Sequence, residues 1–315
     1  MNTSVGGPCS IRAWPISTRR PFALARRPLK GCVSLIKPRM LAAIVALFLG
    51  STAAAAPAGK LWSLLLSREY SLGLAAALCL VAGSNALNNY LDRDIDSLMG
   101  RTRRRALPSA MLSEVEALTF SLALIATSLT LIGFVASELL WAALLGLASY
   151  IALYTLIFKR RTGLNVVAAT PAVAAPILAG WVVGRGFLDA SGLAVAALSM
   201  TWGLAHFWSL TMIFREDYRR AGVPTLPGWL GVDRASKLIV SVSIATASLS
   251  YVPAILGDYG LLYVVGASAL NTVLLALSLS LAFKPISGRR AWRLYKFTAP
   301  YILLLLLVAA LDAHA

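Results

Sequence analysis

Nine long apolar segments constrain this chain more than any other feature of its sequence. Each is close to the roughly 20 residues that a helix needs to cross a bilayer. Charged residues make up 13% of the 315-residue chain, well below the share of about 25% in a typical soluble domain. These features predict an all-α polytopic membrane protein. The expected spans cover residues 40–58, 71–90, 113–134, 138–157, 165–184, 190–212, 236–257, 259–282 and 295–312.

The positive charges are concentrated on one side of these spans. Of the 29 lysines and arginines, 26 lie before the first span or in every second loop after it. Such an asymmetry marks the cytoplasmic side of a membrane protein. It predicts a multi-pass protein of the cell membrane, or of the mitochondrial inner membrane in a eukaryote, with a cytoplasmic or matrix N-terminus. The net charge of +16 is then explained by topology and contact with anionic lipids, so no nucleic-acid partner is expected.

The N-terminal segment differs in composition from the rest of the chain. Residues 1–36 are rich in Arg, Ser and Pro and contain no acidic residue. We interpret them as a basic, disordered tail held near lipid head groups. An organellar targeting segment has the same composition and is the alternative. The membrane-embedded domain is expected over residues 37–315.

Three polar side chains recur at every fourth position where the second apolar segment ends. Asn88, Asp92 and Asp96 stand at i, i+4 and i+8, so they share one stripe on a helix of 3.6 residues per turn. Asp94 points roughly the opposite way and is expected to be solvated or salt-bridged. Like charges at i, i+4 destabilise a helix, and a hard cation with oxygen ligands would offset the repulsion. The stripe therefore predicts a magnesium site with Asp92 and Asp96 as ligands.

Arginines follow this stripe directly, among them Arg101 and Arg103. A guanidinium group binds phosphate through paired hydrogen bonds and stays charged. Magnesium commonly takes one or two carboxylates together with phosphate oxygens of a substrate. The combination indicates a magnesium–diphosphate site at the membrane surface. The alternative is a cytoplasmic loop whose acids only balance its arginines.

A second charged segment follows the sixth apolar span. Two such loops in corresponding places suggest two half-sites that face one cavity. Asp217 is therefore a second candidate metal ligand, and Arg215 and Tyr218 are candidate substrate contacts, although Ala221 leaves Asp217 without a partner at i+4. His206 lies within the span, where an ionisable residue is a functional hypothesis by default. A substrate contact and a hydrogen-bonded structural histidine are equally good interpretations of it.

The stretch "NNYLDRDIDSLMGRTRRRALP" resembles the Asn-x-x-x-Asp-x-x-x-Asp region of the UbiA-type prenyltransferase superfamily. The resemblance extends over about residues 37–312. Within the superfamily, the sequence is most similar to the protoheme IX farnesyltransferase (heme O synthase) branch. Ala106 and Thr225 depart from the usual pattern of that branch without removing a chemical group. The segments that carry the narrower resemblance are "KPRM" (37–40), "YTLIFKRRTGLNVV" (154–167), "HFWSLTMIFREDYRRAGVPTLP" (206–227) and "AWRLYKFTAPYILLLL" (291–306).

This resemblance implies a nine-helix bundle around a central cavity that binds Mg²⁺ and farnesyl diphosphate. By motif position it implies that Asn88, Asp92 and Asp96 hold the metal-bound diphosphate. It places Asp217 in the second acidic site. It also implies a set of further substrate-binding candidates, which are Arg101, Arg103, Lys37, Arg39, Lys159 and Arg160.

The activity implied is transfer of the farnesyl group to a vinyl group of heme b, a substrate here, to give heme O. Downstream partners would be a heme A synthase or oxidase assembly factors. A quinone-precursor or lipid-alcohol acceptor is the rival within the superfamily. A secondary transporter is the rival from another class. Transporters place their carboxylates near the midplane, whereas the acids of this chain cluster at the cytoplasmic ends of its spans.

Overall fold

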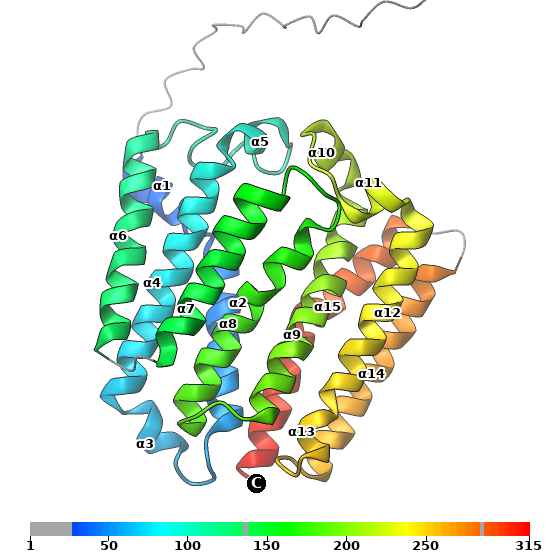
Figure 1. The fold of residues 1–315 in the computed structure, drawn as a ribbon. Helices are drawn as coiled ribbons and strands as arrows, with labels where there is room; N and C mark the ends of the chain where they lie inside the picture. Colours follow the sequence, from blue (N-terminus) through cyan, green and yellow to red (C-terminus); the bar gives the residue numbers. More distant parts are fainter. Residues whose placement is uncertain (1–26, 135–137, 284–286) are drawn as a thin grey trace, which may run out of the picture.

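The described part of the chain is a bundle of helices that run side by side (Figure 1). The computed structural model describes residues 27–134, 138–283 and 287–315, and no strand occurs within these ranges. The helices are α1 (Pro28–Leu35), α2 (Pro38–Ala55), α3 (Leu61–Leu65), α4 (Arg68–Leu91), α5 (Arg93–Leu98), α6 (Glu114–Gly133), α7 (Glu138–Leu147), η1 (Ala148–Phe158), α8 (Asn165–Arg185), α9 (Ala190–Ile213), α10 (Arg215–Arg220), α11 (Leu226–Leu230), α12 (Val232–Ser250), α13 (Val252–Ile255), α14 (Leu261–Ala282) and α15 (Gly288–Ala313).

Nine helical segments within these ranges are long and apolar enough to cross a membrane. This confirms the predicted polytopic all-α class, and each expected span overlaps one of them. The largest difference is in the ninth span, which was expected from residue 295 and begins at Gly288. The Ser287 hydroxyl accepts a hydrogen bond from the Arg290 backbone N–H, so the helix starts at a polar cap. Hydropathy detects only the apolar turns that follow.

The fourth span changes its helical type halfway along. α7 is followed directly by η1, a π-helix over residues 148–158. π-helical turns are rare and are frequently found at functional sites. The Thr155 hydroxyl donates to the Tyr150 carbonyl at 2.7 Å, which links two residues five apart in the same segment. η1 therefore presents its side chains in a register that an α-helix would not give.

Close helix pairs form on either side of a central space. α2 packs on α8 at Gly180, where any Cβ would lie 3.1 Å from Ser51 Cβ and closer still to a backbone carbonyl. α4 packs on α6 at Gly83, where a Cβ would lie 2.8 Å from Ile125 Cγ1. Only glycine permits these approaches. α4 and α8 thus have separate close partners, and a cavity lies between them.

The N-terminal boundary differs from the expectation. The predicted tail extends to residue 36, but residues 28–35 form α1, whose Gly31 and Leu35 are buried. Leu35 packs in a small core with Ala86 of α4 and Ala117 of α6. The sequence of residues 28–35 does not stand out from the preceding residues, because only one face of so short a helix packs against the bundle. Residues 1–26 lie outside the described residues.

The two charged loops lie at one end of the bundle. α5 carries the first and α10 the second, and both stand at the top of Figure 1, away from the chain's C-terminus. Tyr218 of α10 packs in a buried cluster with Ile95 and Met99 of the first loop. The two charged loops therefore contact each other at one end of the bundle.

Candidate active site

A cavity of about 380 Å³ extends from the charged loops into the membrane-spanning part of the bundle. α4, α7, η1 and α8 form most of its wall. Polar and charged side chains line the end next to the loops, and apolar or small side chains line the rest. Such a shape suits a ligand with a charged head and an apolar chain.

The predicted stripe reaches this cavity, although it does not lie on one uninterrupted helix. α4 ends at Leu91 and α5 begins at Arg93, with Asp92 as the residue between them. The backbone keeps its i→i+4 hydrogen bonds, because Asp92 N–H donates to Asn88 O and Asp96 N–H donates to Asp92 O. The helical spacing therefore survives the break. Asn88, Asp92 and Asp96 all line the cavity.

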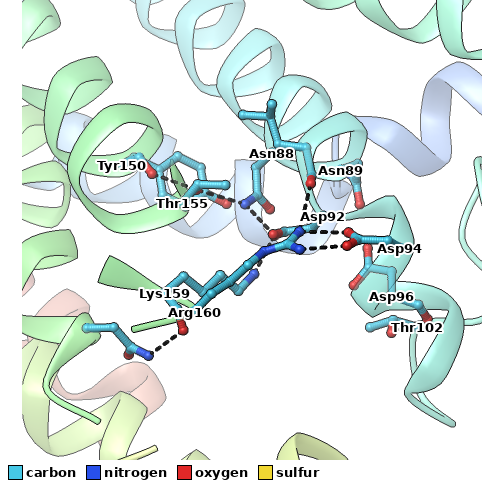
Figure 2. Close-up of polar contacts among 12 residues, drawn as sticks. Asn88, Asn89, Asp92, Asp94, Asp96, Thr102, Tyr150, Thr155, Lys159 and Arg160 are labelled. Atoms are coloured by element: carbon cyan, nitrogen blue, oxygen red, sulfur yellow. Dashed lines mark hydrogen bonds and ion pairs between the residues drawn. The ribbon is translucent and has the colours of Figure 1, made fainter. Parts of the chain in front are cut away.

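Asp92 is the most deeply enclosed carboxylate of the site, with an exposed fraction of 1%. Its Oδ2 accepts a hydrogen bond of 2.7 Å from Asn88 Nδ2 and pairs with the Lys159 ammonium (Figure 2). Its Oδ1 is buried without a hydrogen-bond partner. A buried anionic oxygen of this kind is costly unless a cation or a donor reaches it. It therefore points to a bound cation.

Asp96 is also buried, at 3% exposure. Arg105 Nη1 lies 2.6 Å from its Oδ2, and the Thr102 hydroxyl donates to its backbone carbonyl at 2.8 Å. Arg105 lines the cavity together with Arg101. Among the arginines that follow the stripe, the resemblance singled out Arg101 and Arg103 and not Arg105, because neighbouring arginines on a loop are distinguished only by where the loop turns.

Lys37 reaches the site from the link between α1 and α2. Its φ is +52°, an uncommon and strained value for a residue other than glycine. Its ammonium donates to Asn88 Oδ1 at 2.7 Å. Burial, with the nearby charges of Arg105 and Lys159, lowers the pKa of Lys37 to about 7. An anionic ligand in the cavity would favour the charged form of this side chain.

Two asparagines of α4 hold the backbone that carries Lys37. Asn89 Nδ2 donates to the Leu35 carbonyl at 2.8 Å, and Asn85 Nδ2 donates to the Ile36 carbonyl at 3.1 Å. Their side-chain oxygens are buried without a hydrogen-bond partner. These contacts maintain a strained link that projects Lys37 into the cavity. Sequence spacing could not show this role, because it depends on contacts between segments that are distant in the chain.

We expect Asn89→Ala to lower kcat/KM for a diphosphate substrate about tenfold, mainly through KM, because Lys37 loses its fixed position. Steady-state kinetics in detergent or nanodiscs would measure this. The critical control is Lys37→Met, since in that background the Asn89→Ala change should have little further effect on KM. An undiminished effect of Asn89→Ala in the Lys37→Met variant would show that Asn89 acts in another way.

η1 supplies the opposite wall of the polar end. Tyr150 and Tyr154 line the cavity with their rings stacked at 6.1 Å between centroids. Asn88 Nδ2 also donates to the Thr155 hydroxyl at 3.1 Å, which ties α4 to η1 (Figure 2). The Lys159 backbone N–H donates to the Tyr154 carbonyl at the end of η1. The π-helical register thus places two phenol rings and one ammonium around Asp92.

The second charged loop contributes less than the paired-site hypothesis requires. Tyr218 lines the cavity, and its hydroxyl accepts a 2.6 Å hydrogen bond from Arg101 Nη2. Asp217 is half-buried near Gly100, at which a Cβ would lie 3.9 Å from Asp217 Oδ1, but it does not line the cavity. Glu216 is exposed, and hydrogen bonds from two arginines lower its pKa to about 2. Asp217 is the one acid of this loop placed near the first.

Other candidates lie away from the cavity. Arg160 pairs with Asp94 at 2.6 Å on the exposed side (Figure 2), which agrees with the expected salt-bridged position of Asp94. His206 Nδ1 lies 2.9 Å from the Thr298 hydroxyl, and the His206 ring stacks between Trp202 and Tyr295. These contacts favour the structural interpretation of His206. The remaining candidates outside the cavity lining are exposed: Arg39, Arg103 and Arg215.

The polar end of the cavity offers oxygen donors to a divalent ion. Within the described residues, no three His, Cys, Asp or Glu side chains converge as a complete metal site. Magnesium does not require one, because it retains water and takes phosphate oxygens beside one or two carboxylates. The unpartnered Asp92 Oδ1 and the nearby Asp96 carboxylate meet that requirement. The residues therefore fit Mg²⁺ held jointly with a diphosphate.

Curated relatives match most of this chain in sequence. The chain is 35% identical to protoheme IX farnesyltransferase 1 of Cenarchaeum symbiosum over 88% of this chain and 93% of that protein. It is 37% identical to a protoheme IX farnesyltransferase of Thermus thermophilus over 89% of this chain, which spans 45% of the length of that relative.

Solved structures share the fold at low identity. A digeranylgeranylglyceryl phosphate synthase superimposes with a TM-score of 0.74 at 19% identity, covering 91% of this chain and 98% of the other. A UbiA homolog from Archaeoglobus fulgidus bound to DMAPP and Mg²⁺ gives a TM-score of 0.67 at 16% identity, covering 89% and 99%. The model of the UbiA prenyltransferase family matches residues 41–307, which include most of the first and ninth spans and everything between them. The chain therefore belongs to the UbiA prenyltransferase family.

Proposed function

We propose that this protein transfers the farnesyl group of farnesyl diphosphate to a vinyl group of heme b, giving heme O. One observation carries the proposal. A buried, unpartnered carboxylate oxygen on Asp92 stands among the cations Lys37, Lys159 and Arg105 at the mouth of an apolar cavity. That arrangement fits a metal-bound diphosphate with a long apolar chain. The names of the relatives, protoheme IX farnesyltransferase, support heme as the acceptor.

The polar end of the cavity would act on the departing diphosphate. The bond between C1 of the donor and the diphosphate oxygen breaks, and both bonding electrons leave with the oxygen. Lys37, Lys159, Arg101 and Arg105 line the polar end of the cavity, where we propose that this negative charge develops, and fixed cations there lower the barrier. When bound, Mg²⁺ supplies further charge stabilisation to the same oxygens. Asp92 and Asp96 would hold it, with Asp217 as the candidate for a second ion.

The walls of the cavity would protect the allylic cation left behind. Tyr150 and Tyr154 present aromatic rings beside the polar end, and a ring face attracts a cation. Small and apolar side chains below them exclude water. The vinyl group then bonds to C1, and water adds to the remaining vinyl carbon and releases a proton. The product is a hydroxyethylfarnesyl heme plus diphosphate.

We also propose an orientation of the protein in its membrane. The polar end of the cavity lies at the end of the bundle that carries the arginine-rich loops. By the charge rule for membrane proteins, that end faces the cytoplasm or matrix, where water-soluble diphosphates are available. We further propose that the product passes to a membrane enzyme or assembly factor that consumes heme O.

The decisive experiment incubates purified protein with heme b, farnesyl diphosphate and Mg²⁺ and measures the mass of the pigment formed. We expect a hydroxyethylfarnesyl heme, and we expect EDTA to abolish its formation and added Mg²⁺ to restore it. Turnover with a quinone precursor or lipid alcohol but not with heme would favour the other acceptors. Uptake of a solute by proteoliposomes, without any prenyl product, would instead identify a transporter.

A further inference from the structure

The apolar part of the cavity is a long channel between small side chains. Gly73 and Ala76 of α4 face it, as do Ala143 of α7 and Ala179 of α8. Glycine and alanine on neighbouring helices usually allow close helix packing. Here they border the cavity, where Ala76 and Ala143 also belong to one buried apolar cluster, because α4 packs closely on α6 and α8 packs closely on α2. We call this part the tunnel.

The tunnel is longer than a farnesyl chain. On α4 it extends from Asn88 at the polar end to Gly73, fifteen residues away, which is about 22 Å at the rise of an α-helix. On α8 it extends from Val166 to Ala179, about 20 Å by the same rise. An extended chain advances roughly 1.2 Å per bond, so a farnesyl chain reaches about 13 Å and a geranylgeranyl chain about 18 Å.

We propose that the donor site accepts prenyl diphosphates of up to twenty carbons, and that Gly73 and Phe48 set this limit at the end of the tunnel. The inference rests on the proposed function for the identity of the head group. It adds that the fifteen-carbon donor leaves room for about one more isoprene unit. The protein therefore selects its donor by an upper limit on the length of the prenyl chain.

Phe48 closes the tunnel as a fixed side chain. Its ring is 1% exposed and stacks on Tyr70 at 6.3 Å between centroids. A Cβ at Gly73 would lie 3.8 Å from Phe48 Cζ and 3.9 Å from Val183 Cγ2, which are ordinary contact distances. The site thus has room for a methyl group. A longer side chain at position 73 would enter the end of the tunnel and shorten it.

The test measures donor binding without any acceptor. Thermal unfolding of the full chain in detergent with Mg²⁺ is followed while geranyl, farnesyl, geranylgeranyl and geranylfarnesyl diphosphates are titrated. Affinity should rise up to geranylgeranyl and fall at least tenfold for the twenty-five-carbon donor. In Gly73→Leu, affinity for geranylgeranyl diphosphate should fall at least tenfold more than affinity for farnesyl diphosphate.

Ala75→Leu is the matched control, because position 75 lies two residues along α4 and does not line the cavity. It should leave the ratio of the two affinities unchanged. Equal loss of both donors in Gly73→Leu, or wild-type affinity for geranylgeranyl diphosphate more than tenfold below that for farnesyl, would overturn the inference. If donor affinity depends on chain length as expected but no heme product forms, only the proposed acceptor is refuted. If heme is farnesylated but donor affinity does not depend on chain length in this way, only the length limit is refuted. If no prenyl diphosphate binds, both the length limit and the proposed function are refuted.

Discussion

Asp92→Asn is expected to lower kcat/KM for farnesyl diphosphate about a thousandfold, which corresponds to about 4 kcal/mol of transition-state stabilisation. The substitution preserves the hydrogen bond from Asn88 but removes the charge of a carboxylate whose Oδ1 is buried and unpartnered. The neighbouring carboxylate cannot replace it, because Asp96 also lines the cavity and is expected to bind the metal in its own right. Product mass spectrometry under steady-state conditions would measure the loss.

Asp94→Asn is the control for this variant. Asp94 is two residues away, its side chain is 59% exposed, and it pairs with Arg160 outside the cavity. Removing its charge should change kcat/KM by less than about twofold, because exposed ion pairs contribute little. Circular dichroism and gel filtration would establish that both variants fold. A folded Asp92→Asn variant with normal activity, or one no weaker than Asp94→Asn, would exclude Asp92 from the site.

The membrane architecture was predictable from the sequence for a physical reason. A span must satisfy its backbone hydrogen bonds internally and present apolar side chains to lipid, so each of the nine spans found among the described residues leaves a continuous apolar segment. The ends of spans are less visible. Ser287 caps α15 before a turn that contains Arg289 and Arg290, and a hydropathy average treats that polar turn as loop. Helix α1 was missed because it is short and buries only Gly31 and Leu35.

The first half of the site was predictable because its residues are close in sequence. Asn88, Asp92 and Asp96 follow helical spacing, and this spacing persists through the break between α4 and α5. Contacts between distant segments leave no such signal. Lys159 reaches Asp92 across 67 positions of sequence, and Asn89 holds a carbonyl 54 positions away. The family resemblance selected Lys159, but only the fold distinguishes it from Arg160, which points outward.

The residues that line the tunnel could not be predicted from the sequence, although the family resemblance implied a central cavity. An alanine that faces lipid, a neighbouring helix or an open channel occupies the same place in an apolar segment. Gly73 and Gly180 illustrate the difference, because a Cβ at Gly180 would collide with α2 whereas a Cβ at Gly73 would meet only ordinary contacts. One glycine permits helix packing and the other borders space. The distinction depends on which helices pair.

The cations of the site are held by the acids that we expect to bind metal. Lys159 pairs with Asp92, and Arg105 pairs with Asp96. A diphosphate brought in with Mg²⁺ would exchange these pairs, because the acids would turn to the metal and the cations to the phosphate oxygens. The same charges thus stabilise the protein before binding and the leaving group during reaction. This exchange predicts that Lys159 and Asp92 are energetically coupled.

Lys159→Met should lower kcat/KM for farnesyl diphosphate about a hundredfold. Methionine fills the space of the lysine stem, so the loss reports mainly on the ammonium, which is buried beside Asp92. Lys159→Arg should recover part of the activity, because it restores the charge in a bulkier group. Arg161→Met, two residues along and exposed outside the cavity, should retain activity within about twofold of the wild-type value.

The double variant Asp92→Asn with Lys159→Met decides whether the two residues act on one bound species. If both contact the same metal-bound diphosphate, the second substitution should add less than about tenfold to the loss caused by the first, since groups that act as a unit are strongly non-additive. Independent roles would multiply the two losses to about a hundred-thousandfold. A folded double variant with that larger loss would contradict the shared site, because Lys159 would then act on a step that does not involve Asp92.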